Sequence, residues 1–163
     1  MAPRSEIRTD PAGPSGAPVG PSNRKRVSQW QRELLVWGAR QRRMKFAWGE
    51  TDCGTLLRHG LEVVFGHPIM NIEYASREEA QAWMQQMGTN ASAYFEGCGA
   101  LRHPLSELCG GDVIVRPGIV SKLPRLALAL DEEVLLTSDP VQGPHWIGTK
   151  DLRPRARVYR FGI

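Results

Sequence analysis

The 163-residue chain has no long hydrophobic segment. Its longest apolar runs, residues 61–66 and 126–130, are far shorter than the roughly 20 residues that a membrane-spanning helix requires. The opening sequence MAPRSEIR lacks the apolar core of a secretory signal peptide. We therefore expect no membrane segment and synthesis in the cytoplasm without export.

Cysteine is also scarce, because the chain has only Cys53, Cys98 and Cys109. An odd number without a Cys-x-x-Cys pair argues against a disulfide framework and gives no support to a structural zinc or cluster site. We expect no metal and no cofactor. Two of the three cysteines are expected to be small buried apolar side chains, and Cys53 is considered separately below.

Net charge is low at +4, and it is unevenly distributed. Residues 1–45 carry ten Lys or Arg against three Asp or Glu, residues 46–149 carry six against thirteen, and residues 150–163 carry five against one. A nucleic-acid-binding module usually concentrates positive charge on its folded part, whereas the central part of this chain is acidic. The pattern argues against a specific nucleic-acid partner.

The composition divides the chain into an arm and one domain. Seven of the twelve residues in 11–22 are Pro or Gly, so residues 1–22 are expected to form a flexible arm that becomes ordered only against a partner. Residues 23–163 are expected to form a single domain.

The first half of that domain has helical periodicity. We expect a helix at about 28–43 that begins with a capping box at Ser28–Gln31,. One face of it is apolar, and the residues that lie roughly on this face are Val27, Trp30, Leu34 and Leu35,. A second helix begins at Cys53, where Thr51 or Asp52 is the N-cap, and ends at Gly66,. Its buried stripe comprises Cys53, Leu56, Leu57, Gly60, Leu61 and Val64. A third helix opens at Ser76 with Ala80, Trp83, Met84 and Met87 as its apolar stripe, and a short helical turn covers 91–96.

After Gly110 the period changes from 3.6 to 2, which is typical of strands. Residues 112–115 and 157–161 are expected to be strands, and 126–130 and 134–138 a hairpin,. Helices followed by antiparallel strands predict an α+β domain.

The order of local motifs resembles the NlpC-type cell-wall cysteine peptidases, which have a papain-like fold. The motifs are an aromatic-x-Trp-Gly segment at Phe46–Gly49, an Asp-Cys pair that opens a helix, a Gly-Asp pair that opens a strand, and a hairpin. More narrowly, residues 46–53, 65–68 and 74–80 look like an uncharacterised branch encoded in phage tail-gene clusters. The resemblance covers about residues 30–161 and implies N-terminal helices packed on a small antiparallel sheet.

The resemblance makes Cys53 the candidate nucleophile. A cysteine at a helix N-terminus benefits from free N–H groups and the helix dipole, both of which favour the thiolate. The alternative is that Cys53 simply begins the buried stripe of its helix. Trp48, Gly49 and Asp52 belong to the motif that leads to it. Gly111 and Asp112 open the strand, where Asp112 is expected to fix the turn by side-chain hydrogen bonds rather than to take part in catalysis.

The base that this chemistry requires is missing from its usual place. In the resembling family a histidine opens the second strand, and a second polar residue follows twelve positions later. Here Arg125 and Thr137 stand at these positions. An arginine does not accept a proton from a thiol. If its position corresponds to the histidine, we expect Arg125 to point towards the start of the Cys53 helix; the alternative is a charge at the edge of the hairpin that points to water. Among the other histidines, His145 is the outside candidate for a base.

We therefore expect a degenerate NlpC-type fold that serves as a structural or assembly protein of the phage tail tip or baseplate. Its partners would be hub, distal-tail or tail-tube proteins, and its location the virion. The alternative is an active cysteine hydrolase that uses Cys53 to cleave peptidoglycan during phage entry.

Overall fold

The computed structural model describes residues 25–87, 91–117 and 124–162, so the expected arm at 1–22 lies outside the described residues. The described helices are α1 (Trp30–Gln41), α2 (Cys53–Phe65), α3 (Arg77–Met87) and α4 (Ala91–Gly97). The strands are β1 (Leu101–His103), β2 (Val113–Arg116), β3 (Arg125–Ala129), β4 (Val134–Asp139), β5 (Gly143–Gly148) and β6 (Arg157–Arg160). Two short 3₁₀ turns, η2 (Leu105–Glu107) and η3 (Thr149–Asp151), lie between strands. No helix in the described ranges has the length and apolarity needed to cross a membrane.

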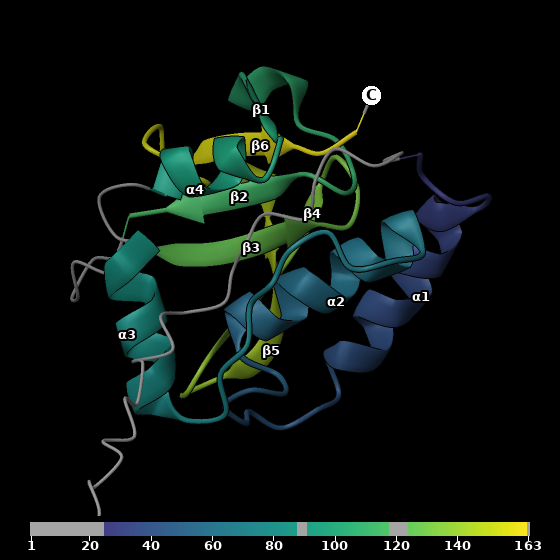
Figure 1. Ribbon diagram of the computed structural model, residues 1–163. Helices are drawn as coiled ribbons and strands as arrows, with labels where there is room; N and C mark the ends of the chain where they lie inside the picture. The colour runs from purple at the N-terminus through teal and green to yellow at the C-terminus, as the bar shows by residue number, and fades with distance from the viewer. Residues whose placement is uncertain (1–24, 88–90, 118–123, 163) are drawn as a thin grey trace, which may run out of the picture.

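All six described strands form one sheet in the order β1-β6-β2-β3-β4-β5, and every neighbouring pair is antiparallel. Helices α1 and α2 lie side by side, and α2 packs on β3 and β4 (Figure 1). The expected α+β class, with helices first and antiparallel strands afterwards, is therefore confirmed.

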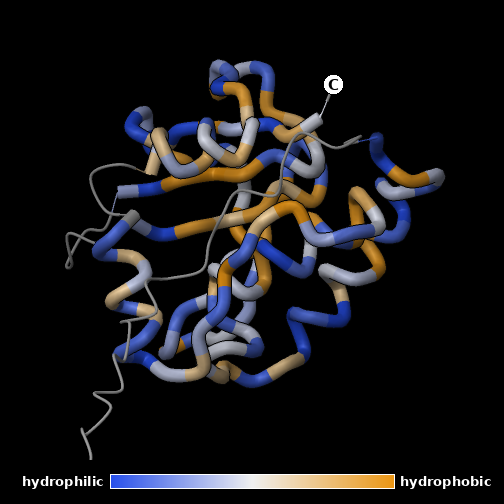
Figure 2. Tube along the Cα trace, viewed as in Figure 1, coloured by the Kyte–Doolittle hydropathy of each residue, from blue (hydrophilic) through white to orange (hydrophobic). Residues whose placement is uncertain are grey.

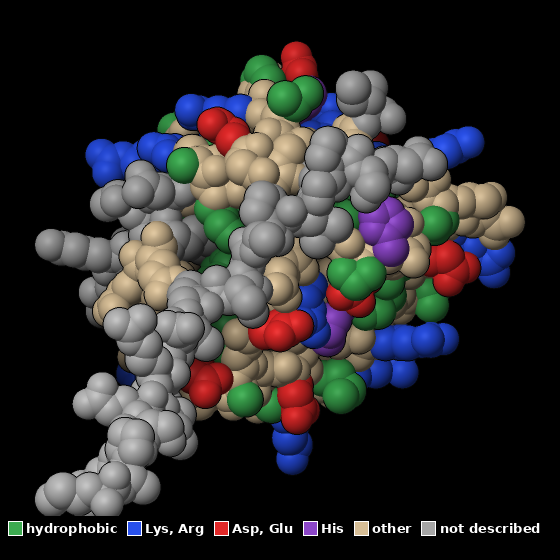
Figure 3. Space-filling view, viewed as in Figure 1, with side chains coloured by type: hydrophobic (Ala, Val, Ile, Leu, Met, Phe, Trp, Pro, Cys, Tyr) green, Lys and Arg blue, Asp and Glu red, His purple; other side chains and the backbone are tan. Residues whose placement is uncertain are grey.

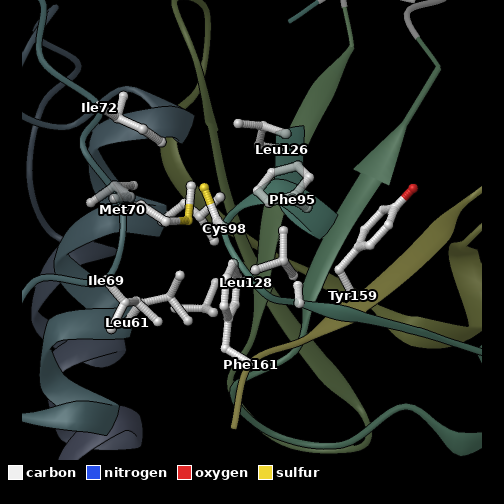
Figure 4. Close-up of a cluster of buried hydrophobic side chains, with 14 of the residues drawn as sticks. Leu61, Ile69, Met70, Ile72, Phe95, Cys98, Leu126, Leu128, Tyr159 and Phe161 are labelled. Carbon is white, nitrogen blue, oxygen red and sulfur yellow. The ribbon is translucent and has the colours of Figure 1, made fainter. Parts of the chain in front are cut away.

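The sheet buries side chains on both faces. The larger core lies between the helices and the sheet, where Leu61 of α2 and Ile69, Met70 and Ile72 approach Leu126 and Leu128 of β3 (Figure 4). The most hydrophobic stretches run along β2 and β3 in the middle of the molecule (Figure 2). A smaller core on the opposite face contains Leu108, Ile114, Ala127, Ala129, Leu135 and Val158. The alternation in β3 therefore assigns even-numbered residues to the α2 side and odd-numbered residues to the other face.

Helix α2 matches its sequence pattern closely. Asp52 is its N-cap, and Gly66 ends it in the left-handed conformation with φ +74°. The expected stripe is buried from Leu56 to Val64, and Cys53, which is only partly buried, packs against the same core.

Helix α1 differs from expectation at its start and on its face. The N-cap is Gln29 in the left-handed region, with φ 60° and no side-chain cap, so the predicted capping box at Ser28 is wrong. Leu34 is fully buried, whereas Leu35 is 39% exposed. The inner face of α1 is formed instead by Leu34 and Gly38, together with the partly buried Trp30 and Trp37.

Strands β1 and β5 were not predicted from the sequence. Strand β1 is only three residues long, and β5 contains Gly143 and Pro144. A proline is tolerated in β5 because this strand lies at an end of the described sheet, where one side of the backbone has no partner strand.

Candidate functional site

The segment before α2 is a tight turn organised by Asp52. The carboxylate accepts N–H groups from Gly49 at 2.7 Å and Thr55 at 3.1 Å. The Thr55 hydroxyl donates to it at 2.8 Å, and the Tyr74 hydroxyl donates to its Oδ1. Asp52 is 1% exposed and has four donors, so its place in the sequence motif is explained by turn and cap formation. Burial, followed by the charge of Asp52, raises the pKa of Tyr74.

The Trp-Gly pair is a packed part of the same turn. Gly49 has φ +76°, and a Cβ at this position would lie 2.4 Å from the carbonyl oxygen of Tyr74, so only glycine fits here. Trp48 meets Phe46 edge to face, with ring centroids 4.9 Å apart. The Trp-Gly pair is therefore explained by packing of the turn before α2.

Cys53 occupies the first position of α2 and contacts the beginning of β3. The pKa of its thiol is raised from 9.0 to about 11, chiefly by burial and also by the nearby charge of Asp52. Backbone hydrogen bonds from Leu126 and Gly54 lower the pKa, as does the positive charge of Arg116, but burial prevails. The folded protein therefore disfavours the thiolate relative to a free cysteine. The helix N-terminus alone does not make Cys53 a ready nucleophile.

Arg125 does not point towards the start of α2. It is exposed and lies directly opposite Arg116 in the β2–β3 register. Its odd-numbered position places it on the sheet face that carries Ala127 and Ala129, away from α2,. The expected approach of Arg125 to Cys53 is therefore wrong.

Arg116, which the sequence motifs do not single out, is the one guanidinium of the described residues whose charge lowers the pKa of Cys53, and its effect is the smallest of those that act on the thiol. Arg116 is partly buried at the end of β2, and its Nη2 donates to the Thr137 hydroxyl at 3.3 Å. Burial lowers the pKa of Arg116, and the adjacent charge of Arg125 lowers it further. Arg116 could have been found from the strand pairing, because β2 and β3 are antiparallel neighbours and place Arg116 opposite Arg125.

On the α2 side, apolar groups take the positions that a base would occupy. Pro124 directly precedes β3. If the alternation of the strand extends to this residue, Pro124 lies on the same face as Leu126, towards α2, and it is buried,. Twelve positions later, Leu136 of β4 is buried in the main core. Thr137 lies on the opposite face, and its hydroxyl donates to the Leu126 carbonyl at 2.8 Å.

All four histidines fall within the described residues, and each contacts a group other than Cys53. His59 lies beside Arg58, whose Nη2 donates to its Nε2 at 2.8 Å. His67 is 3.1 Å from the Pro68 carbonyl, and His103 is 3.4 Å from the carboxylate of Glu107. Burial, followed by the charge of Arg58, lowers the pKa of His59.

His145 lies in β5 rather than in a loop. Its Nδ1 donates to the Gly143 carbonyl at 2.8 Å, and its Nε2 is 3.8 Å from the carboxylate of Asp139. It pairs with Thr137 in the β4–β5 register, which places it on the face away from α2. The groups that act on the Cys53 thiol are Asp52, Gly54, Arg116 and Leu126, and none of them is a histidine.

Asp112 has the structural role expected for it. The side chain is fully buried, accepts the Cys109 N–H at 2.9 Å and binds both Nε and Nη2 of Arg160 at 2.8 Å. Gly111, with φ +83°, completes the turn into β2. This pair therefore fixes the turn and joins it to β6.

The remaining cysteines do not join Cys53. Cys98 is buried beside Tyr94 and Cys109 lies near Asp112, and no disulfide joins any of the three cysteines, all of which lie in the described ranges. Across the ranges 25–87, 91–117 and 124–162, no three His, Cys, Asp or Glu side chains gather into a metal-binding group.

The site is defined by helix α2, which begins with the partly buried Cys53 and packs on the six-stranded antiparallel sheet. Residues 25–156 match the family described as a domain of unknown function, DUF6950. The chain belongs to this family, because the match covers most of its length. No curated protein matches the sequence.

Proposed function

We propose that the chain is an NlpC-type, papain-like domain that has lost its hydrolase chemistry and serves as a structural or assembly component of a phage tail tip. The observation that carries the proposal is the environment of Cys53. A cysteine stands at the nucleophile position, at the start of a helix that packs on an antiparallel sheet, but it is partly buried, burial raises its pKa, and no histidine is among the groups that act on its thiol.

The arrangement of α2 and β3 supports the papain-like part of the proposal. Papain-like chemistry requires a cysteine at a helix N-terminus that faces the first residues of a neighbouring strand. The Leu126 backbone at the start of β3 contacts the Cys53 thiol and α2 packs along β3. The fold alone does not decide activity.

The α2-facing positions support the loss of activity. If the correspondence with the resembling family is shifted by one residue, Pro124 takes the position of the histidine and Leu136 that of the second polar group. Neither side chain accepts or donates a proton. Removal of a general acid–base partner costs on the order of a hundred- to ten-thousand-fold in rate.

The tail-tip location rests on the resemblance of residues 46–53, 65–68 and 74–80 to proteins encoded with phage tails. A domain without catalytic chemistry would act there as an adaptor that contacts hub, distal-tail or tail-tube proteins. Tail particles purified from a phage lysate should then contain the chain, and its absence by mass spectrometry would contradict this location.

The loss of chemistry is tested with purified peptidoglycan and muropeptides. We expect the wild-type protein, a Cys53→Ala variant and a matched Cys109→Ala variant to release no more product than buffer. Cleavage by the wild type and by Cys109→Ala that disappears in Cys53→Ala would instead establish an active cysteine hydrolase.

The active hydrolase is the second candidate function, and one observation favours it. Two backbone hydrogen bonds and the charge of Arg116 all lower the pKa of the Cys53 thiol. A substrate bound next to Cys53 would leave these pKa-lowering interactions in place, and they would favour the thiolate. The peptidoglycan experiment separates the two candidates.

A further inference from the structure

A cavity of about 490 Å³ opens beside the end of β2 and the start of β3. Four of its lining residues are arginines, and one is acidic, Asp151. The arginines are Arg116, Arg125, Arg153 and Arg155. We refer to these four residues and the cavity between them as the arginine pocket. Arg116 and Arg125 have been considered singly in relation to Cys53, but the proposed function assigns no role to the cavity that they share with Arg153 and Arg155.

Three separate segments bring these arginines together. Arg116 and Arg125 lie directly opposite each other on β2 and β3. Arg153 and Arg155 belong to the connection between η3 and β6, which is held against the sheet by Leu152 and Ala156 in the smaller core. The pocket is therefore a product of the fold and not of a single basic stretch.

The positive charge in the pocket is poorly compensated. Within the described part of the chain, none of the four arginines has a carboxylate oxygen within salt-bridge distance. Nε of Arg116 is buried and has no hydrogen-bond partner. Like charges directly opposite each other on adjacent strands destabilise a sheet, and the Arg116–Arg125 pair has this arrangement. A bound anion would remove the repulsion and supply the missing acceptor.

We propose that the arginine pocket binds a small ligand that carries two or more phosphate or carboxylate groups. Guanidinium groups bind both kinds of oxyanion through two parallel N–H donors. Four arginines and one aspartate give a formal charge of +3, which suits a multiply charged anion. The volume lies within the range of ordinary small-molecule sites.

A small ligand fits better than a nucleic acid. Single-stranded nucleic acids are bound by basic grooves with aromatic side chains on which bases stack. Among the described residues, those that line the pocket include no aromatic side chain; besides the four arginines and Asp151 they are Pro117, Pro154 and Ala156. Among the coloured side chains on the face shown in Figure 3, acidic, basic and histidine side chains are interspersed.

The test is calorimetric titration of the full chain with inorganic pyrophosphate at constant ionic strength. We expect the wild type to bind and the Arg125→Gln/Arg155→Gln variant to bind at least about tenfold more weakly, since it loses two charge-assisted donors. Both positions are exposed, so the variant should fold. Arg102→Gln, at an exposed arginine of β1 outside the pocket, is the matched control and should bind like the wild type.

Two further arms identify the ligand chemistry. Tighter binding of pyrophosphate than of citrate indicates a phosphate ligand, and the reverse indicates a carboxylate ligand. The melting temperature of ligand-free Arg125→Gln should also rise slightly, because the substitution removes the repulsion on Arg116. No wild-type binding at millimolar pyrophosphate, equal weakening by Arg102→Gln, or binding of oligothymidylate alone would overturn the proposal.

Discussion

Asp52 accepts hydrogen bonds from two backbone N–H groups and two hydroxyls, and these donors come from both sides of the turn before α2. Its carboxylate is therefore a structural centre that ties Gly49 and the Tyr74 segment to the helix. The sequence pattern correctly offered Asp52 as an N-cap, but it gave no sign of Tyr74, which lies 22 residues further on.

The Asp52→Ala substitution tests this role. We expect the free energy of unfolding to fall by about 2–4 kcal/mol, because the helix loses its cap and buried donors lose their acceptor. Tyr74→Phe removes only one donor and should cost about 1 kcal/mol. Urea denaturation followed by tryptophan fluorescence measures both, and equal losses in the two variants would contradict the assignment.

The Cys53 thiol gives a dependence of stability on pH. In the unfolded chain the thiol ionises near pH 9.0, whereas in the folded protein it ionises near pH 11. The unfolded state therefore loses its proton first, so the free energy of unfolding falls as pH rises from about 9 to 11. Below pH 9 this contribution is fully present.

The measurement compares the wild type with Cys53→Ala by urea denaturation at pH 8 and at about pH 10.5. We expect the wild type to lose on the order of 2 kcal/mol more than the variant over the interval. The comparison is needed because tyrosines and lysines titrate in the same range. The same fall in both proteins would mean that the folded thiol ionises normally.

The position of Arg125 shows why a single sequence did not predict the site in full. Successive residues of a strand point to opposite faces, so an error of one residue in the correspondence moves a side chain to the other side of the sheet. Local motifs predicted the start of α2 well. The alignment of residues 124–130 with the histidine-bearing strand of the resembling family depended on alternating Leu and Ala, which do not show which residues face the core. Arg116 became visible only through its pairing across the hairpin.

Helix α2 and strand β5 mark the two extremes of predictability. A complete 3.6-residue stripe, an N-cap and a terminal glycine all indicate α2, and the structure agrees with each. In β5, Gly143 and Pro144 read as a loop, and only the strand's position at an end of the sheet permits them,. That position depends on pairing with β4, which is tertiary information.

Gly60 lies where α2 comes close to β3 and α1. A Cβ at this position would lie 2.1 Å from a methyl of Leu128 and 2.9 Å from the Trp37 ring. We expect Gly60→Ala to lower the free energy of unfolding by about 1–3 kcal/mol, although alanine is the better helix former.

Gly97→Ala is the matched control, because a Cβ at the end of α4 would have no atom within 4 Å. It should leave stability unchanged or raise it by up to about 1 kcal/mol. Thermal and urea unfolding of both variants check the expectation. A neutral Gly60→Ala would show that α2 and β3 are less closely packed than described.

Across the whole molecule, the Asp112–Arg160 ion pair joins β6 to the turn before β2, 48 residues earlier in the chain. We expect Arg160→Leu to lower the free energy of unfolding by about 2–4 kcal/mol, since the fully buried Asp112 carboxylate would lose its counter-charge,. Asp112→Asn/Arg160→Leu removes both charges and should lose less than Arg160→Leu alone. A double-mutant cycle in urea measures the coupling, and simple additivity would contradict it.

Strand β6 has a further consequence for biosynthesis. It follows every other described strand in the chain, yet it lies between β1 and β2 in the sheet. While the ribosome is still making residues 157–160, both neighbours of β6 have backbone edges without a partner. Unpaired edges readily join strands of other chains. Nascent or prematurely terminated chains on one polysome are therefore exposed to cross-pairing, and this protein completes its sheet only after nearly all of the described sequence has been translated.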